Sequence, residues 1–302
     1  MFECVLRIFN LSQIQGYKAE LYEDKIHRVR PNSEGIIGGN KFFIDKFGFR
    51  IPKKNYEYKS SKKILFLGDS VTFGVGVKEE KTFVGLYRIN SKSNEVYNLA
   101  LFGYQIEDYL VQLDEISQFY PVEKIVYFLT LNDVYDHNNV KTVKYSENEY
   151  REGFKRILNH DFFRQINHFL RDKSYLYTFL KGVIADPQAS WFQNVFNYYK
   201  ENELGFVKSF FVKFKEIAYN ENINSYVFIL PYEFQTRNCN RETLMPQIKI
   251  KALSKGIKNF YDLTSDFCRY KNPKKLYLKY DPMHLSEEGH DFVYSLTNEI
   301  IN

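Results

Sequence analysis

Cysteine is scarce in this sequence, and the few cysteines do not pair by their spacing. Cys4, Cys239 and Cys268 are three in number and irregularly placed, without a CxxC pair. Disulfide frameworks show even numbers of cysteines at characteristic spacings, and zinc modules commonly contain CxxC pairs. We therefore expect buried or incidental thiols in a reducing compartment.

Long hydrophobic runs are also absent. No stretch reaches the roughly 18 apolar residues that a membrane-spanning helix needs. Residues 1–9 are apolar but are interrupted by Glu3 and Arg7, and no small-residue cleavage site follows them. They do not match a signal peptide. We expect a cytoplasmic protein without a membrane-spanning segment. A periplasmic or membrane-associated location, and a longer form with an anchor before this chain, stay open.

Charge of one sign is not concentrated in any run. The formal net charge is +5, and the lysine pairs Lys62-Lys63 and Lys274-Lys275 stand alone. Nucleic-acid-binding chains carry clustered basic residues, so we expect no nucleic-acid partner. The chain also lacks the GxSxG, Walker, GxGxxG and HExxH patterns, and we expect neither a cofactor nor a metal ion.

The chain does contain a repeated unit, in which a short apolar run is followed by a polar turn and a helical pattern. These runs are residues 63–67, 95–99, 124–130, 225–230 and 259–263. Continuous apolar strands that alternate with helices are typical of a parallel sheet covered on both faces. The 302 residues, of which 44% are hydrophobic, suffice for one large α/β domain with an insertion.

Two segments fall outside this pattern. Residues 1–60 are polar and rich in turns, and we expect them to form an N-terminal arm packed on a domain of residues 61–302. Residues from about 137 to 220 are far longer than a single crossover helix and contain helical patterns, for example over 191–199. We interpret them as a helical insertion in that domain.

Ser70 is the candidate nucleophile. It follows the strand at 63–67 in Gly68-Asp69-Ser70, where a strand-to-helix turn exposes its hydroxyl and the helix amino end supplies backbone N–H groups. A serine hydroxyl needs a base, a group that orients the base, and donors for the oxyanion that forms. Taken alone, the triplet fits an N-cap serine better.

His284 is the candidate base, in Asp281-Pro282-Met283-His284 before the last predicted helix. An Asp three residues before a His on one tight turn can hold the imidazole through its Nδ1–H and leave Nε2 for Ser70. A single DxxH more often marks an ordinary loop histidine. His137, in the loop after the third strand, is the alternative base, and we expect His290 to point away from the site.

Asn132 and Gly103 are the candidate oxyanion donors. Asn132 directly follows the strand at 124–130, and its amide can donate to an oxyanion. Gly103 follows the strand at 95–99, and a glycine lets the backbone N–H approach a substrate closely. Each also fits an ordinary turn. Reactive groups in open parallel sheets nevertheless gather at the carboxyl ends of the strands, where both residues are expected.

Together these blocks resemble the SGNH, or GDSL-like, hydrolase family. The family's blocks are a GDS triplet, a glycine, an Asn-Asp pair and a DxxH near the C-terminus. In this chain they are Gly68-Asp69-Ser70, Gly103, Asn132-Asp133 and Asp281-Pro282-Met283-His284. The resemblance covers about residues 63–298 without the insertion. It implies a three-layer, flavodoxin-like α/β/α sandwich around a five-stranded parallel sheet.

The resemblance also assigns roles to residues. It implies Ser70, Asp281 and His284 as catalytic residues. It implies an oxyanion hole made by the N–H groups of Ser70 and Gly103 and by the Asn132 side chain. Asp69 and Asp133 are expected to support these groups.

A finer resemblance lies in the arm. Pro31-Asn32-Ser33 and Asp45-Lys46-Phe47-Gly48-Phe49-Arg50 look like bacterial SGNH proteins associated with acyl modification of surface polysaccharides. The sequence therefore predicts a carboxylic ester hydrolase that acts through an acyl-enzyme, interpreted first as a carbohydrate O-acetylesterase. An O-acyltransferase that passes an acetyl group to a sugar hydroxyl, and a non-catalytic carbohydrate-binding protein, are the alternatives. We expect a small-molecule or glycan ester as substrate. Its acyl group, its alcohol and the oligomeric state stay open.

Overall fold

The computed structural model describes residues 2–8, 16–58, 62–91, 95–135, 166, 169–237 and 239–301. Its strands are β1 (Tyr17–Lys18), β2 (Leu21–Glu23), β3 (His27–Val29), β4 (Glu34–Ile37), β5 (Asn40–Ile44), β6 (Arg50–Ile51), β7 (Lys63–Leu67), β8 (Glu95–Asn98), β9 (Val122–Leu129), β10 (Asn224–Ile229) and β11 (Asn259–Asp262). Its α-helices are α1 (Phe2–Ile8), α2 (Ser70–Phe73), α3 (Phe83–Asn90), α4 (Ile106–Asp114), α8 (Tyr175–Ile184), α9 (Pro187–Glu201), α10 (Gly205–Asn220), α11 (Glu233–Arg237), α12 (Met245–Leu253), α13 (Thr264–Arg269) and α14 (Glu287–Ile301).

Five parallel strands form the centre of the structure, in the order β8-β7-β9-β10-β11. They coincide closely with the five apolar runs of the sequence, and the predicted five-stranded parallel sheet is confirmed. Numbered along the chain, this order is second, first, third, fourth, fifth, which is the flavodoxin-like order. In such sheets the ligand crevice lies at the carboxyl ends of the strands where the order reverses, here beside β7 and β9.

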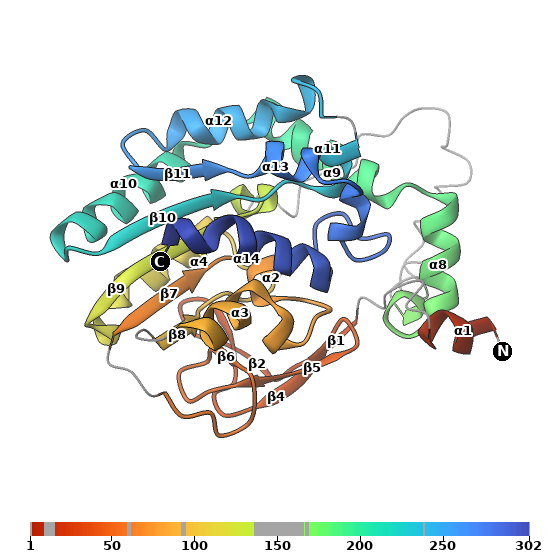
Figure 1. The fold of residues 1–302 in the computed structure, drawn as a ribbon, viewed down its shortest axis with the longest axis horizontal. Helices are drawn as coiled ribbons and strands as arrows, with labels where there is room; N and C mark the ends of the chain where they lie inside the picture. The colour runs from red at the N-terminus through yellow and green to blue at the C-terminus, as the bar shows by residue number, and fades with distance from the viewer. Residues whose placement is uncertain are drawn as a thin grey trace.

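Helices cover both faces of this sheet (Figure 1). Neighbouring residues of a strand point to opposite faces, and on β9 Tyr127 and Phe128 are such a pair. The Tyr127 ring lies 5.0 Å from that of Tyr109 on α4 and 5.2 Å from that of Phe210 on α10. The Phe128 ring lies 4.4 Å from that of Phe83 on α3, and α3 packs against α14. The predicted α/β/α sandwich is therefore confirmed.

The arm extends the sheet as an antiparallel edge. β6 pairs with β8, and β5, β4 and β1 follow outward, so the sheet continues beyond the five predicted strands (Figure 1). Arg50 on β6 is buried. Its guanidinium donates to the carbonyl oxygens of Phe73, Gly74 and Val77. These carbonyls lie at and just beyond the end of α2, so an arm residue secures the helix that begins with Ser70.

Only part of the predicted insertion lies among the described residues. Residues 136–165, 167 and 168 lie outside them, and so does His137, the alternative base. α8 packs beside α1, and α9 packs beside α11 and α12. In α10, Phe210 and Phe214 are fully buried and the helix packs on α4 in one layer of the sandwich. α10 therefore belongs to one layer of the sandwich.

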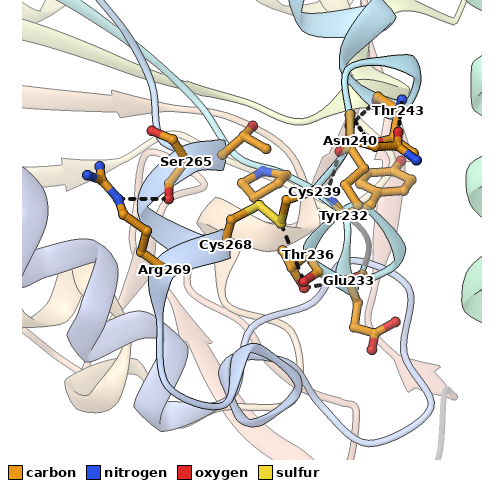
Figure 2. The surroundings of a disulfide bond; sticks show 12 residues. Tyr232, Glu233, Thr236, Cys239, Asn240, Thr243, Ser265, Cys268 and Arg269 are labelled. Atoms are coloured by element: carbon orange, nitrogen blue, oxygen red, sulfur yellow. Dashed lines mark hydrogen bonds between the residues drawn. A yellow bond between two sulfur atoms is a disulfide. The ribbon is translucent and has the colours of Figure 1, made fainter.

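A disulfide corrects the expectation of free thiols. Cys239, which follows α11, is bonded to Cys268 in α13 across a Cα–Cα distance of 6.0 Å (Figure 2). α11 packs against α13, and this contact brings together two cysteines that are 29 residues apart in sequence. Cys4 is a free, exposed thiol. Cysteine usage therefore does not favour a reducing compartment.

None of the described helices combines the length and the apolar character needed to cross a bilayer.

Candidate active site

Ser70 stands at a sharp turn between β7 and α2. Gly68 has a φ of 155°, and a Cβ at this position would lie 2.2 Å from Thr72 Oγ1. Only glycine fits there, which explains the first residue of the triplet. Asp69 caps α2, because its Oδ1 accepts the N–H of Val71 at 2.9 Å. The serine therefore begins the helix at the carboxyl edge of the sheet.

The structure brings Ser70, His284 and Asp281 together in one line of hydrogen bonds. Ser70 Oγ lies 2.8 Å from His284 Nε2, and His284 Nδ1 lies 2.8 Å from Asp281 Oδ2. The other carboxylate oxygen, Asp281 Oδ1, accepts the backbone N–H groups of Met283 at 3.0 Å and His284 at 2.8 Å. The aspartate is thereby fixed on both oxygens, and its tight turn sets the direction of the imidazole.

The electrostatics of this pair suit a base. Burial acts to lower the pKa of His284, but the charge of Asp281, its hydrogen bond and the charge of Asp69 together raise it above 6.5. Burial acts to raise the pKa of Asp281, but His284 and the two backbone N–H groups lower it below 3.8. The carboxylate therefore holds a proton on Nδ1, and the lone pair of Nε2 faces the serine hydroxyl.

Three N–H groups at this edge can serve an oxyanion. The backbone N–H groups of Ser70 and Gly103 donate to no acceptor within the described part of the chain. Gly103 has a φ of 85°, a left-handed conformation that favours glycine. Asn132 Nδ2 donates one hydrogen to Asp69 Oδ2 at 3.0 Å, so its second hydrogen stays available.

Sequence reasoning missed Tyr232, the residue that orients Asn132. Tyr232 is fully buried just beyond β10, and its hydroxyl donates to Asn132 Oδ1 at 2.7 Å. The indole of Trp191 on α9 hydrogen-bonds to the same phenol. A polar-tipped aromatic directly after the fourth apolar run was the available signal, because Ser70, Gly103 and Asn132 each follow an apolar run in the same way.

Asp69 and Asp133 are joined through the hydroxyl of Thr130. Thr130 Oγ1 lies 2.7 Å from Asp69 Oδ2 and 3.0 Å from Asp133 Oδ1, yet a hydroxyl has only one proton to donate. Burial, and then the charge of Asp69, raise the pKa of Asp133 well above 3.8. If Asp133 is protonated and donates to Thr130, which in turn donates to Asp69, every contact is satisfied. These contacts predict that Asp69 accepts and that Asp133 donates.

His290, on the last helix, is not placed for catalysis. His290 on α14 is buried, and its Nδ1 accepts the backbone N–H of Phe83 at 3.2 Å. Burial, with the charges of Arg50 and His284, lowers the pKa of His290 to about 3, so its ring stays neutral. Across the described ranges, no three His, Cys, Asp or Glu side chains are grouped so that they could hold a metal ion.

A pocket of about 460 Å³ opens beside His284. One wall is the loop that carries Tyr280 and Asp281, and the other is formed by α8 and α9. A Cβ at Gly182 of α8 would lie 2.1 Å from Cγ of Tyr280, so glycine lets the helix pack on the loop. Trp191 also lines the pocket and is 41% exposed. The pocket volume is typical of sites for small ligands.

No family model and no curated protein sequence matches the chain. Solved structures of similar arrangement include an acetyl xylan esterase, 16% identical, with a TM-score of 0.46, over 80% of this chain and 100% of that one. They include an extracellular lipase from Streptomyces rimosus, 12% identical, with a TM-score of 0.45, over 79% and 99% of the two chains. A member of the lipolytic G-D-S-L family from Veillonella parvula is 11% identical, with a TM-score of 0.41, over 79% and 97%.

The sheet order, the two helical layers and the positions of Ser70, Gly103 and Asn132 beyond β7, β8 and β9 agree with the fold that the sequence motifs imply.

Proposed function

We propose that the chain is a carboxylic ester hydrolase that acts through an acyl-enzyme on Ser70. The observation that carries the proposal is the unbroken line from Ser70 Oγ through His284 to Asp281, with both hydrogen bonds at 2.8 Å. A serine, a neutral imidazole and a carboxylate in this geometry are the parts that nucleophilic acyl transfer requires.

In the acylation step, the triad residues and the three N–H donors each have one role. Ser70 Oγ attacks the ester carbonyl carbon while His284 Nε2 takes the hydroxyl proton, and Asp281 stabilises the imidazolium that forms. The carbonyl oxygen becomes an anion, which the N–H groups of Ser70 and Gly103 and the free Asn132 hydrogen can bind. The intermediate then collapses. The bond between the carbonyl carbon and the alcohol oxygen breaks, and the alcohol leaves with the proton from Nε2.

Deacylation repeats these steps with a second nucleophile. Water, deprotonated by His284, attacks the acyl-serine and releases a carboxylic acid. A sugar hydroxyl in the same place would instead accept the acyl group, which is the transferase alternative. Both reactions need the same residues, and the fate of the acyl-enzyme depends on which nucleophile occupies the pocket.

We propose an acylated carbohydrate as the substrate. The support lies in the pocket beside His284. The flat rings of Trp191 and Tyr280 line this pocket together with the polar side chains of Thr178, Ser190 and Asn194. Amphipathic aromatic rings of this kind contact partly polar ligands through an apolar face. The part of the insertion that forms α8 and α9 would then contact the alcohol portion of the substrate.

An oxidising compartment is proposed as the site of action. Disulfides persist in secreted and periplasmic proteins and are rare in the reducing cytosol, and the pair Cys239 and Cys268 fits the former. This proposal replaces the cytoplasmic expectation drawn from the sequence.

Covalent labelling tests the proposed chemistry. A fluorophosphonate probe should modify the protein once, at Ser70, as located by mass spectrometry of its peptides. Ser70→Ala should remove the label and lower the turnover of a small acetyl ester by about 10³-fold or more. An unlabelled but folded protein would support the non-catalytic alternative.

Product partitioning tests the fate of the acyl group. The protein is incubated with an acetyl ester, with and without oligosaccharide acceptors, and the products are identified by mass spectrometry. Free acetate alone would mark an esterase. Acetylated oligosaccharide would mark a transferase.

A further inference from the structure

The peptide between Phe102 and Gly103 is held by a residue from the arm. His27 lies on β3, and its Nε2 is 3.1 Å from the carbonyl oxygen of Phe102. A carbonyl oxygen can only accept, so the hydrogen bond requires a proton on Nε2. His27 is therefore the donor, and its ring also contacts that of Tyr104 edge-on at 5.0 Å.

The geometry of a trans peptide links this contact to the oxyanion hole. The C=O and N–H of one trans peptide point in opposite directions, and among the described peptides only Tyr120-Pro121 is cis. A donor that fixes the Phe102 carbonyl on one side therefore fixes the Gly103 N–H on the other. This is the N–H that donates to no acceptor within the described residues.

Gly103 needs such an external constraint. Its φ of 85° lies in a region where glycine moves freely, and it belongs to no helix or strand. A Cβ on Gly103 would lie 3.4 Å from His27 Nε2, so the histidine is packed directly against this backbone. The neighbouring Phe102 ring is also held by the arm, at 5.2 Å from Tyr17 and 6.5 Å from Phe42.

We propose that His27 is a positioning residue of the oxyanion hole. It acts through the Phe102 carbonyl to aim the Gly103 N–H at the developing charge, and this makes the arm part of the catalytic apparatus. The inference rests on the proposed acyl-enzyme chemistry. It extends that chemistry to a segment that the four motif blocks do not include.

Two substitutions separate the hydrogen bond from packing. His27→Leu removes the donor and keeps an apolar side chain. His27→Gln keeps an N–H at a reach similar to that of Nε2. The expected result is a fall in kcat of about tenfold for His27→Leu, since donor alignment acts mainly in the transition state. KM should stay within about twofold, and His27→Gln should recover most of the loss.

The neighbouring residue offers a matched control. Arg28 donates to Glu115 Oε2 at 2.6 Å and so anchors the same strand through a different hydrogen bond. Arg28→Met should leave kcat near that of the unchanged protein. A loss as large as that of His27→Leu would mean that arm docking in general, and not this hydrogen bond, supports activity, and would overturn the proposal.

The rate of fluorophosphonate labelling at Ser70 gives a second readout. It should fall in His27→Leu by a factor similar to that in kcat, because phosphonylation also develops an oxyanion. Labelling and turnover at the unchanged rate, in folded His27→Leu, would overturn the role of His27 and leave the nucleophile intact. If His27→Leu does not fold, His27→Met serves as the donor-free variant. Absence of labelling in the unchanged protein would overturn the proposed function itself.

Discussion

The phenol of Tyr232 donates a hydrogen bond of 2.7 Å to Oδ1 of Asn132. This contact decides which way the Asn132 amide is turned. With Oδ1 bound by the phenol, Nδ2 faces Asp69 Oδ2 at 3.0 Å and presents its second hydrogen at the edge where Ser70 stands. A flipped amide would place two donors, the phenol and Nδ2, against each other.

Tyr232→Phe should therefore impair the oxyanion hole while keeping the buried ring. Asn132→Ala is expected to lower kcat by about 10²–10³-fold, and Tyr232→Phe by about tenfold, each with a smaller change in KM. The double variant should be no slower than Asn132→Ala, because Tyr232 acts through that amide. Steady-state kinetics of all three variants test this.

A nearby tyrosine supplies the control. Tyr277 is also buried, and its hydroxyl donates to the carbonyl oxygen of Pro231 at 2.9 Å, next to Tyr232 in the chain. Tyr277→Phe should leave kcat within about threefold of the unchanged protein, because this hydroxyl binds none of the reacting groups, and should lower the free energy of unfolding by about 1 kcal/mol. If the losses in kcat of Tyr232→Phe and Asn132→Ala multiplied in the double variant, Tyr232 would act through a group other than the Asn132 amide.

Asp69 and Asp133 should respond in opposite ways to amide substitution. Asp133→Asn can donate to Thr130 Oγ1 as the protonated acid does, and its oxygen can accept from Tyr127, whose hydroxyl lies 2.7 Å from Asp133 Oδ2. We expect a free energy of unfolding within about 1 kcal/mol of the original and turnover within about threefold.

Asp69→Asn cannot be accommodated in the same way. Asp69 accepts from Val71, Thr130 and Asn132, and an amide nitrogen in place of either oxygen meets a donor. We expect a loss of about 1–3 kcal/mol in stability and a fall in kcat of about tenfold or more. Urea unfolding and kinetics measure both. Equal losses for the two amide variants would contradict a protonated Asp133.

The pH dependence of kcat/KM should reflect His284. The imidazole must be neutral to take the proton of Ser70, so activity rises as pH increases through its pKa. Because that pKa is raised above 6.5, the acid limb should lie above 6.5. Asp281→Asn removes the charge that raises the pKa, so the limb should move to lower pH while the maximal rate falls by about 10³–10⁴-fold. An acid limb that Asp281→Asn left unmoved would contradict this assignment.

The disulfide predicts the thiol count. Protein made under oxidising conditions should react with an alkylating agent under denaturing conditions at Cys4 alone, and at all three cysteines after reduction. Cys239→Ser should lower the free energy of unfolding by about 2–4 kcal/mol, whereas Cys4→Ser, at an exposed position, should have little effect. Three reactive thiols before reduction would exclude the bond.

The central architecture and the outline of the site could be predicted from local patterns in the sequence. Five apolar runs predicted five parallel strands because burial on both faces leaves a local, readable pattern. Ser70, Gly103 and Asn132 could be chosen because each follows its own strand, and parallel strands end at one edge. The Asp281 and His284 pair was readable because a tight turn places residues three apart within hydrogen-bond reach.

The contacts that hold these parts in place join residues far apart in the chain and could not be predicted from local patterns. Tyr232 is 100 residues from Asn132, and His27 is 75 residues from Phe102, and neither pair has any periodicity to reveal it. Cys239 and Cys268 likewise meet only because α11 packs on α13. Such contacts follow from the docking of whole elements, whose free energy comes from burying apolar surface. A polar residue at their contact gains its partner only when that docking is complete.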